Sequence, residues 1–473
     1  METGCLGPCD DGPVILVYPE GVMYSRLRTT DPSRLVEEHL LKGRVVKDLV
    51  YRERRPDEQK SVVSLEHQGY LETQNRIVLR NCGRIDPDSI NEYIASNGYQ
   101  ALAKCLTELT PEQVLTIIKD SGLRGRGGAG FPTGVKWSFT ANTAADQKYI
   151  VCNADEGEPG TFKDRLILEG DPHSIIEGMA IAGYAVGADQ GIVYVRGEYT
   201  LSITRMKKAI AQAREVGLLG RGIFGADFDF EIEIRAGAGA YVCGEETALI
   251  ESIEGNRGEP RVKPPFPGVA GLWGKPTIVN NVETLANVAP IILNGADWYR
   301  RIGTEKCPGT KVFTMLGDIS NQGLIEVPMG ITLREIINGV GGGIPGGRRF
   351  KMAQTGGTSG GCLPADFLDL PMDYDTLANA GSALGSGALL IMDETHCIVD
   401  ILQCFMKFFR HESCGRCAPC REGTARLYEL ISDFAEGRAE AGHIELIREL
   451  AKAMELSSLC GLGQAAPNPV LTC

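Results

Sequence analysis

The chain has 473 residues, a formal net charge of −13 at pH 7, 43% hydrophobic residues and 23% charged residues. Its length exceeds one ordinary core and suggests about three domains. The acidic balance gives no support for binding to nucleic acid or to a membrane surface, and no stretch reaches the roughly 18 consecutive apolar residues of a membrane helix. Because no secretory signal opens the sequence and the cysteine count of 15 is odd, we expect a cytoplasmic protein whose reduced thiols can bind metal.

The N-terminal residues contain two cysteines, Cys5 and Cys9, followed by an apolar run over 14–18 and a helical pattern over 31–42. These features are typical of a small α/β domain. The stretch after residue 50 is charged, contains proline and is predicted to be a linker.

A run of glycines follows the helical pattern that begins at Thr110. This run, G-R-G-G-A-G over 125–130, matches the G-x-G-x-x-G dinucleotide fingerprint, but it follows a helix, whereas the ordinary fingerprint follows a strand. Glycine still lets a backbone approach a ring or a phosphate closely, and Arg126 and Lys136 add positive charge. A flexible connector is the alternative for this segment.

Polar segments then follow predicted strands or open predicted helices. The predicted strands are 149–152, 191–195 and 228–234. The polar segments are 152–160, 237–246 and 280–284. A strand, a glycine turn and a helix start together form the arrangement that binds nucleotides at strand ends, although each segment alone could be capping or turn chemistry.

A second unit is predicted over 308–380, and the pattern after Asp400 is helical almost throughout. Between these helices lies the loop Cys414-Gly-Arg-Cys417-Ala-Pro-Cys420, and Cys460 follows further on. Three thiolates on one loop and one distant thiolate are a usual ligand pattern of a [4Fe-4S] cluster. Zinc commonly takes two separated ligand pairs, so it fits this spacing less naturally and stays the alternative.

Five motifs, in this order, closely resemble the NADH-binding FMN/[4Fe-4S] flavoprotein subunit of respiratory complex I and its relatives in NAD-linked or electron-bifurcating hydrogenases and formate dehydrogenases. The motifs are Gly122–Gly134 with Lys136 and Trp137, Cys152–Gly160, Gly239–Thr247, Val279–Thr284 and Glu412–Thr424.

The resemblance implies an α/β multidomain fold. Its parts would be a partial thioredoxin-like domain over 1–50, a linker over 51–80, a Rossmann-like FMN- and NADH-binding domain over 81–305, a ubiquitin-like β-grasp domain of SLBB type over 306–385, and a helical bundle with the cluster over 386–473.

The resemblance also implies the binding residues. FMN would lie on Gly125, Arg126, Gly127 and Gly128, near Lys136, Asn153, Asp155 and Glu156, with its ribityl-phosphate end held by Asn280, Asn281 and Thr284. NADH would stack over the flavin, and its contacts would be Phe131, Phe139, Glu158, Tyr241, Glu245, Glu246, Lys263 and Phe266, with Gly244 also among the cofactor-binding residues. The cluster ligands would be Cys414, Cys417, Cys420 and Cys460, in agreement with the spacing argument.

The implied function is that of an NADH dehydrogenase (diaphorase) subunit that exchanges a hydride between NADH and FMN, in either direction, and relays single electrons through the cluster. Hydride transfer between cofactors needs no acid or base from the protein, so no catalytic side chain is predicted. The acids Glu158, Glu245 and Glu246 should repel the 2′-phosphate of NADPH, although some of them could instead only cap helices or pair with a lysine.

The N-terminal cysteines resemble half of the ligand set of a thioredoxin-like [2Fe-2S] domain. Because two thiolates cannot hold that cluster alone, either the domain is vestigial or an upstream segment is absent. The remnant favours a soluble hydrogenase- or formate-dehydrogenase-type complex, which could bifurcate electrons, over the peripheral arm of membrane NADH:quinone oxidoreductase. The expected partners are iron–sulfur subunits, including a thioredoxin-like [2Fe-2S] subunit, and a hydrogenase, formate dehydrogenase or comparable catalytic subunit. A non-catalytic metal-binding scaffold is the alternative from another class.

Overall fold

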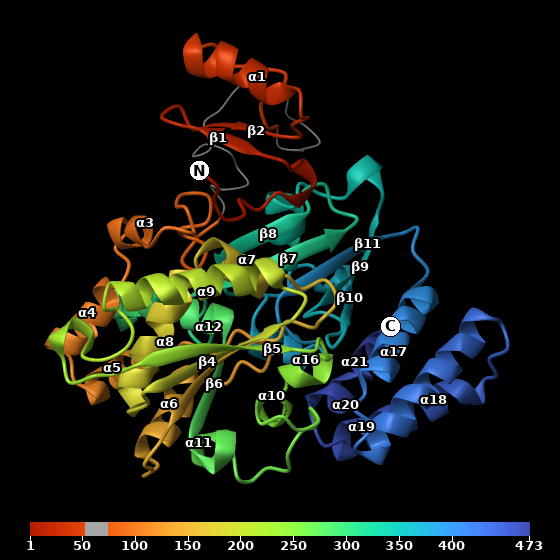
Figure 1. Cartoon of the computed structure of the whole chain (residues 1–473). Helices are drawn as coiled ribbons and strands as arrows, with labels where there is room; N and C mark the ends of the chain where they lie inside the picture. The colour runs from red at the N-terminus through yellow and green to blue at the C-terminus, as the bar shows by residue number, and fades with distance from the viewer. Residues whose placement is uncertain (53–73) are drawn as a thin grey trace.

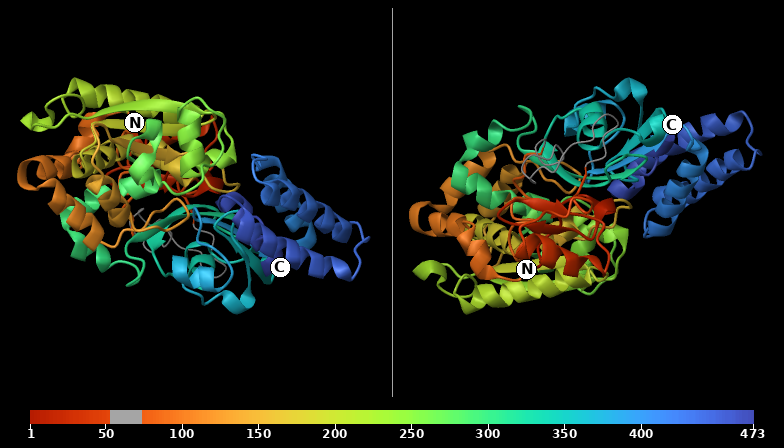
Figure 2. Two further views of the ribbon diagram at one scale, coloured as in Figure 1. Left: turned by 90° about the horizontal axis from the view of Figure 1, so that it is seen from below. Right: turned by 90° about the horizontal axis from the view of Figure 1, so that it is seen from above.

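The structure is a computed structural model that describes residues 1–52 and 74–473. It contains two separate larger sheets with helices around them and a group of helices at the C-terminal end (Figure 1). Figure 2 shows that these C-terminal helices stand together at one side of the molecule. Among the described residues, none of the helices combines the length and apolar character needed to cross a bilayer.

The N-terminal segment is a small two-stranded unit. Its elements are η1 (Cys9–Asp11), β1 (Ile15–Val17), β2 (Val22–Tyr24), α1 (Asp31–Leu35) and the π-helix η2 (Val36–Leu41). Strands β1 and β2 pair antiparallel around a small core. The backbone of Gly7 and Cys9 is hydrogen-bonded to residues 322–324, where an edge strand of the second large sheet begins. Leu324 N–H donates to Gly7 O at 3.1 Å, and Cys9 N–H donates to Gln322 O at 3.1 Å.

The first large sheet has four parallel strands in the order β5-β4-β3-β6. These strands are β3 (Tyr149–Ala154), β4 (Gln190–Arg196), β5 (Glu231–Gly237) and β6 (Thr277–Asn281). Strands β3, β4 and β6 are buried along most of their length, as expected where helices cover both faces of a parallel sheet. The strand predicted from residue 228 begins only at Glu231, because Phe230 exchanges two backbone hydrogen bonds with Gly220 before β5 starts to pair with β4.

Helices and short turns surround this sheet. They are α3 (Ile90–Ala95), α4 (Gln100–Glu108), α5 (Pro111–Asp120), α6 (Thr133–Asn142), α7 (Lys163–Gly170), α8 (Pro172–Val186), α9 (Thr200–Glu215), η4 (Ile223–Gly225), η5 (Tyr241–Gly244), α10 (Glu246–Ile253), α11 (Pro267–Ala270), η6 (Leu272–Gly274), α12 (Val282–Ala286), α13 (Val288–Asn294) and α14 (Ala296–Arg300). The helix predicted from Thr110 is α5, where Thr110 and Gln113 form a capping box. Helix α8 is buried along almost its whole length and packs in the main core.

The second large sheet is mixed and has the order β10-β9-β11-β7-β8, in which only β11 and β7 are parallel. Its elements are β7 (Thr310–Gly317), β8 (Gly323–Pro328), α15 (Leu333–Glu335), η7 (Ile336–Val340), η8 (Pro345–Gly347), β9 (Phe350–Thr355), β10 (Cys362–Pro364), η9 (Ala365–Phe367), α16 (Tyr374–Asn379) and β11 (Ala388–Asp393). We predicted that the helical bundle starts at 386, but β11 lies inside this sheet. The reason is its pairing with β7 and β9, which no local pattern reveals.

The end of the predicted linker, residues 77–79, is buried and hydrogen-bonded to the second sheet. The buried backbone N–H groups of Ile77, Val78 and Leu79 donate to the carboxylate of Glu326 on β8 at 3.0, 3.0 and 2.8 Å. Part of the predicted linker range, residues 53–73, lies outside the described residues.

The C-terminal elements are α17 (Ile398–Glu412), α18 (Ala418–Ala435), α19 (Gly442–Ser457), α20 (Gly461–Ala465) and α21 (Asn468–Thr472). Their apolar faces share one core, which includes Phe409, Leu427 and Met454. This core continues into residues of both larger sheets and of η5, so the helices pack against the first and the second sheet.

Candidate functional site

The glycine loop, residues 125–130, connects α5 to α6 and lies against the end of β6. Gly125 N–H donates to Phe131 O at 2.8 Å, which closes the loop. A side-chain carbon added at Gly127 would come within 2.9 Å of the Cβ of Asn281. The close approach of the two backbones therefore requires glycine at this position.

The loop keeps free hydrogen-bond donors. The N–H of Arg126 donates to Thr284 Oγ1 at 2.8 Å. Within the described part of the chain, the N–H groups of Gly127 and Gly128 meet no acceptor. Successive free N–H groups are the usual cradle for a phosphate or another anionic group.

The side chain of Arg126 points away from this cradle. It is completely buried, and its guanidinium donates to Thr310 O at 3.0 Å, Pro308 O at 2.6 Å and the Tyr299 hydroxyl at 3.0 Å. Its charge is therefore used to anchor the loop, and only its backbone faces Thr284.

Asn153 and Asp155 lie at the carboxyl end of β3. Asn153 Nδ2 donates to Gly244 O at 2.8 Å, and Gly244 also packs beside Asp155. Both carboxylate oxygens of Asp155 are buried without a hydrogen-bond partner among the described residues. Burial raises the pKa of Asp155 to about 7. A buried carboxyl group without partners at a strand end fits a ligand with hydroxyl or N–H donors, such as FMN.

Glu156 is turned to the opposite side. Its carboxylate accepts from the N–H groups of Asp164 at 3.0 Å and Arg165 at 3.1 Å, and from the Tyr199 hydroxyl at 3.2 Å. It therefore caps the start of α7, and burial raises its pKa to about 7.

Two acids and two lysines form an ion-pair group beside the site. Lys263 Nζ lies 2.8 Å from Glu245 Oε1 and 3.0 Å from Glu246 Oε1, and Lys136 Nζ lies 2.7 Å from Glu246 Oε2. Burial alone would raise the pKa of Glu246, but Lys136 and Lys263 lower it to about 2. Glu245 also caps α10 through the N–H of Thr247 at 2.8 Å. Glu245 therefore both caps a helix and pairs with a lysine, and Glu246 pairs with two lysines. This is the alternative that the sequence left open.

Glu158 connects the first sheet to the second. It accepts from the Tyr241 hydroxyl at 2.5 Å, from the Ser359 N–H at 3.0 Å and from the Thr358 hydroxyl. Tyr241 N–H in turn donates to Glu412 Oε2 at 3.0 Å, at the end of α17. These bonds join three parts of the molecule at one point.

The predicted residues at β6 are held by neighbours. Asn280 Oδ1 accepts from the indole N–H of the buried Trp137 at 2.7 Å. Asn281 caps α12 and donates to Asp164 Oδ2 at 2.6 Å.

Three predicted aromatic contacts remain exposed, with Phe131 at 50%, Phe139 at 59% and Phe266 at 59%. Exposed aromatic side chains are available for contact with a flat ligand.

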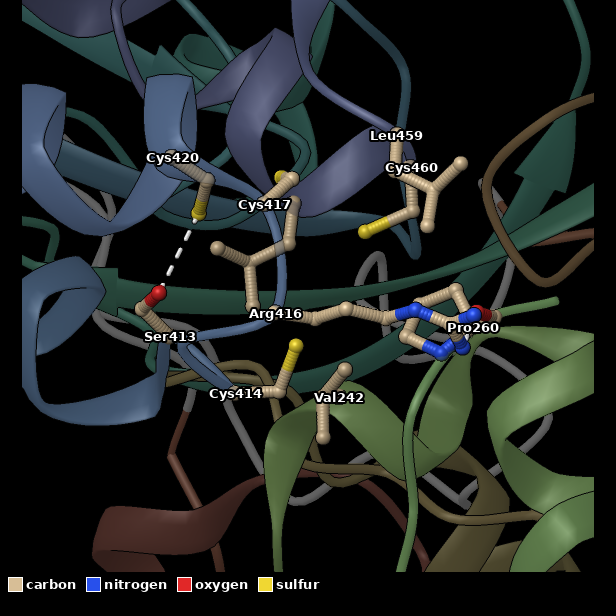
Figure 3. A pocket seen from close by; sticks show the side chains of 10 residues that line it. Val242, Pro260, Ser413, Cys414, Arg416, Cys417, Cys420, Leu459 and Cys460 are labelled. Atoms are coloured by element: carbon tan, nitrogen blue, oxygen red, sulfur yellow. Dashed lines mark hydrogen bonds between the residues drawn. The ribbon is translucent and has the colours of Figure 1, made fainter. Parts of the chain in front are cut away.

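The four predicted cluster ligands converge on one hollow. In Figure 3 the sulfur atoms of Cys414, Cys420 and Cys460 point into the space that all four cysteines line. Cys417 and Cys460 stand directly before the first turns of α18 and α20. The side chains of Val242, Pro260 and Leu462 line the same hollow. Apolar walls around thiolates suit a buried cluster, because they limit its contact with water.

The choice between a cluster and zinc rests on the ligand pattern. Three cysteines close together in sequence and one distant cysteine are a usual ligand set of a [4Fe-4S] cluster, whereas zinc commonly takes two separated pairs. Among the described residues, three candidate ligand atoms lie within 4.8 Å of one another only at Asp318, Asp393 and His396. Those three are already engaged in ion pairs, His396 with Asp318 and Asp393 with Arg348.

The cysteine loop is tied to the first sheet's loops. Arg416 donates to Pro260 O at 2.6 Å, and Arg257 donates to Cys414 O at 2.8 Å. The short segment Tyr241–Gly244 adjoins both sites, because Gly244 packs beside Asp155 while Val242 lines the cysteine hollow.

The N-terminal cysteines are Cys5 and Cys9. Among the described residues, these two belong to no group of three ligand atoms that all lie within 4.8 Å of one another. Burial raises the pKa of Cys9 to about 11. The [2Fe-2S] expectation, which depended on an upstream segment, stays a prediction.

Sequence reasoning missed several residues that shape the site. Tyr374 bonds to the glycine loop from the second sheet, and a completely buried ionic group joins Lys163, Glu283 and Lys311 beneath Asn281. Glu283 stands inside the motif Val279–Thr284, and Lys163 follows the polar segment 152–160 by a few residues, but no role was predicted for either. Tyr374 and Lys311 lie in no recognised motif, and their partners are distant in sequence.

Comparison with known proteins matches the same regions. Residues 118–290 match the Nuo51 FMN-binding domain, residues 400–473 match the NADH-ubiquinone oxidoreductase-F iron-sulfur binding region, and residues 312–363 match the SLBB domain. These matches confirm the expected FMN and [4Fe-4S] regions.

Curated relatives cover most of the chain. It is 57% identical over 399 residues to the NADP-reducing hydrogenase subunit HndC of Solidesulfovibrio fructosivorans, covering 84% of this chain and 81% of the relative. It is 48% identical over 390 residues to the F 2 subunit of NADH-quinone oxidoreductase from Rhizobium meliloti, covering 82% of this chain and 93% of the relative.

A solved structure resembles the whole fold. A chain of NAD+-reducing [NiFe]-hydrogenase in the H2-reduced state matches with a TM-score of 0.74 and 35% identity, over 99% of this chain and 75% of that one. The chain therefore belongs to the family of NADH-binding oxidoreductase subunits with FMN and [4Fe-4S] that includes the F subunits of NADH-quinone oxidoreductase and the hydrogenase subunit HndC.

Proposed function

We propose that this chain is the subunit of a multi-subunit oxidoreductase at which NADH meets FMN, and that electrons leave through the cysteine site toward iron–sulfur partner subunits, or run in reverse. FMN, when bound, exchanges a hydride with a nicotinamide and single electrons with a cluster. The observation that carries the proposal is the segment Tyr241–Gly244, which touches both the Asp155 end of the flavin site and the cysteine hollow.

In this proposal the chain's own residues position the ligands and exclude water. The free N–H groups of Gly127 and Gly128 would bind the flavin, Asp155 would accept a hydrogen bond from it, and Asn153 and Lys136 would hold its surroundings in shape. Asn280, Asn281 and Thr284 would fix the ribityl-phosphate end. Gly125, the Arg126 backbone and Glu156 support this surface indirectly, through the bonds described above.

The nicotinamide nucleotide would lie on the exposed aromatic surface of Phe131, Phe139 and Phe266. Glu158 and Tyr241, which are joined by a hydrogen bond of 2.5 Å, would also contact the nucleotide. Glu245 and Glu246 with Lys263 would face its ribose groups. Because Lys136 and Lys263 balance the charges of Glu245 and Glu246, this group exerts no net repulsion on a 2′-phosphate, and the preference for NADH over NADPH stays a prediction from the sequence.

We also propose a fold type for each domain. The parallel sheet supports a Rossmann-like FMN domain, the mixed sheet supports a β-grasp domain, and residues 1–50 support a thioredoxin-like remnant. The likeness to HndC and to a hydrogenase structure supports a cytoplasmic hydrogenase- or formate-dehydrogenase-type complex with a thioredoxin-like [2Fe-2S] partner subunit. The 48% identity to the Rhizobium meliloti relative favours NADH:quinone oxidoreductase as the second candidate.

Anaerobic purification of the full chain tests the core of the proposal. We expect bound FMN, iron in place of zinc, and NADH-dependent reduction of an artificial dye. A colourless zinc protein without this activity would instead support a non-catalytic scaffold. Co-purification from the native host then separates the complexes, because a hydrogenase, a formate dehydrogenase or membrane subunits would accompany the chain.

A further inference from the structure

The glycine loop is held from behind by a residue of the second sheet's domain. Tyr374, the first residue of α16, is 7% exposed, and its hydroxyl donates to Gly125 O at 2.6 Å. Its ring lies so close to Gly130 that an added side-chain carbon there would come within 2.7 Å of it. Gly130 also has a φ of 62°, which favours glycine.

Arg124 fixes the tyrosine and the loop together. Its guanidinium lies 4.8 Å from the centre of the Tyr374 ring, and its Nε donates to Gly130 O at 2.7 Å. The same guanidinium pairs with Asp375 at 3.2 Å. Tyr374 and Arg124 thus bind the carbonyl groups at both ends of the loop, Gly125 O and Gly130 O. These bonds leave the N–H groups of Gly127 and Gly128 free to bind a ligand.

The middle of the loop also touches the second sheet's domain. Gly128 packs against the backbone of Gly385. The next residue, Ser386, accepts through its carbonyl from Lys311 Nζ at 2.9 Å. The second sheet's domain therefore supports the loop at Gly125, Gly128 and Gly130.

We propose that Tyr374 is a positioning residue for flavin binding and that the second sheet's domain is a structural half of the flavin site. This inference rests on the proposed function, since it takes the glycine loop to be the flavin-binding surface. The Tyr374 hydroxyl selects the loop conformation in which the free N–H groups face the ligand. Without that bond the loop samples other conformations, and only the competent fraction binds.

The test compares Tyr374→Phe with Tyr184→Phe in the full chain. Tyr184 is a matched control, because its hydroxyl also donates to a main-chain carbonyl, Leu109 O at 2.8 Å, away from the loop. The dissociation constant for FMN is measured by quenching of flavin fluorescence after removal and return of the flavin. The urea midpoint of the flavin-free protein is measured for each variant.

We expect Tyr374→Phe to weaken FMN binding about fivefold or more relative to Tyr184→Phe, while both variants lower the urea midpoint by similar amounts. Equal FMN affinity in the two variants overturns the positioning role. If Tyr374→Phe does not fold, Asp375→Asn takes its place, since that side chain is 48% exposed. Weaker FMN binding at an unchanged midpoint then supports the role, and unchanged binding overturns it. A wild-type chain that takes up no FMN contradicts the proposed function itself, so the two failures are distinguishable.

Discussion

The glycine-loop site and the cysteine site are built in opposite ways. Cys414 and Cys417 stand on a short loop before α18, Cys420 lies in the first turn of α18, and Cys460 precedes α20 in the same helical group. The flavin site instead gathers segments from α5, three strand ends and the second sheet's domain. Its contacts span long separations, such as the 249 residues between Gly125 and Tyr374. A metal site can therefore depend on local spacing, whereas the nucleotide site depends on the packing of two domains.

The largest expected effect tests whether the two sites are independent. Cys417→Ser should abolish cluster binding, because serine replaces a thiolate ligand, yet leave FMN content and NADH-dependent dye reduction close to wild type. Iron analysis, electron paramagnetic resonance and a dye assay measure these properties. Cys404→Ser, at an exposed cysteine on α17, is the control and should change none of them. Loss of FMN from Cys417→Ser would show that the two sites are coupled.

The buried ionic group of Lys163, Glu283 and Lys311 should stabilise the packing between the first sheet and the second sheet's domain. Glu283 lies 2.6 Å from Lys311 Nζ and 3.0 Å from Lys163 Nζ, and all three side chains are completely buried. Glu283→Gln removes the carboxylate that pairs with the buried Lys311, whereas Lys163 keeps Asp164 at 2.6 Å, so we expect the free energy of unfolding to fall by about 3–5 kcal/mol in urea titrations.

A surface pair is the control for this variant. Asp369, whose side chain is 74% exposed, pairs with Arg334, and Asp369→Asn should lower the free energy of unfolding by less than about 1 kcal/mol. Similar losses in the two variants would mean that the ionic group adds nothing to the packing of the two domains.

Asp155 gives a pH-dependent prediction for the flavin-free chain. Burial raises its pKa from 3.8 to about 7, with Glu198 and Glu412 adding to the shift and Arg196 opposing it. The folded state thus binds this proton more tightly than the unfolded state. Its contribution is complete below about pH 4 and is lost as the pH rises through 7.

Asp155→Asn replaces the carboxyl group by an amide that does not titrate, so this loss of stability at high pH does not occur. The variant should therefore exceed wild type in free energy of unfolding at pH 8, by on the order of 2–4 kcal/mol, and the difference should shrink toward pH 4. Urea titrations at several pH values measure it. Asp120→Asn, at an exposed position, should show no such dependence. A difference that does not vary with pH would contradict the assignment of a buried, unpartnered carboxyl group.

The smallest expected effect concerns the contact between the two sites. Arg416→Ala removes the bond to Pro260 O, and we expect a loss of about 1 kcal/mol in the free energy of unfolding. The control is Arg426→Ala, which breaks only a surface pair with Glu429. If the Arg416 variant is no less stable than the control, the cysteine loop does not depend on this contact.

The sequence alone determined the cofactor classes, the family and most elements near the site. Cysteine spacing, helix caps and strand alternation act over a few residues, so they are visible without a fold. The comparisons confirm the FMN and [4Fe-4S] regions, whereas the individual flavin and NADH contacts stay predictions.

Only the tertiary structure decided how the flavin site is supported. It turned the Arg126 side chain inward, placed Glu156 at the start of α7, put β11 into the second sheet and brought Tyr374 under the glycine loop. These outcomes depend on which distant groups satisfy a buried charge or a buried N–H. Such partners are chosen by packing between segments far apart in the chain, which local patterns do not record.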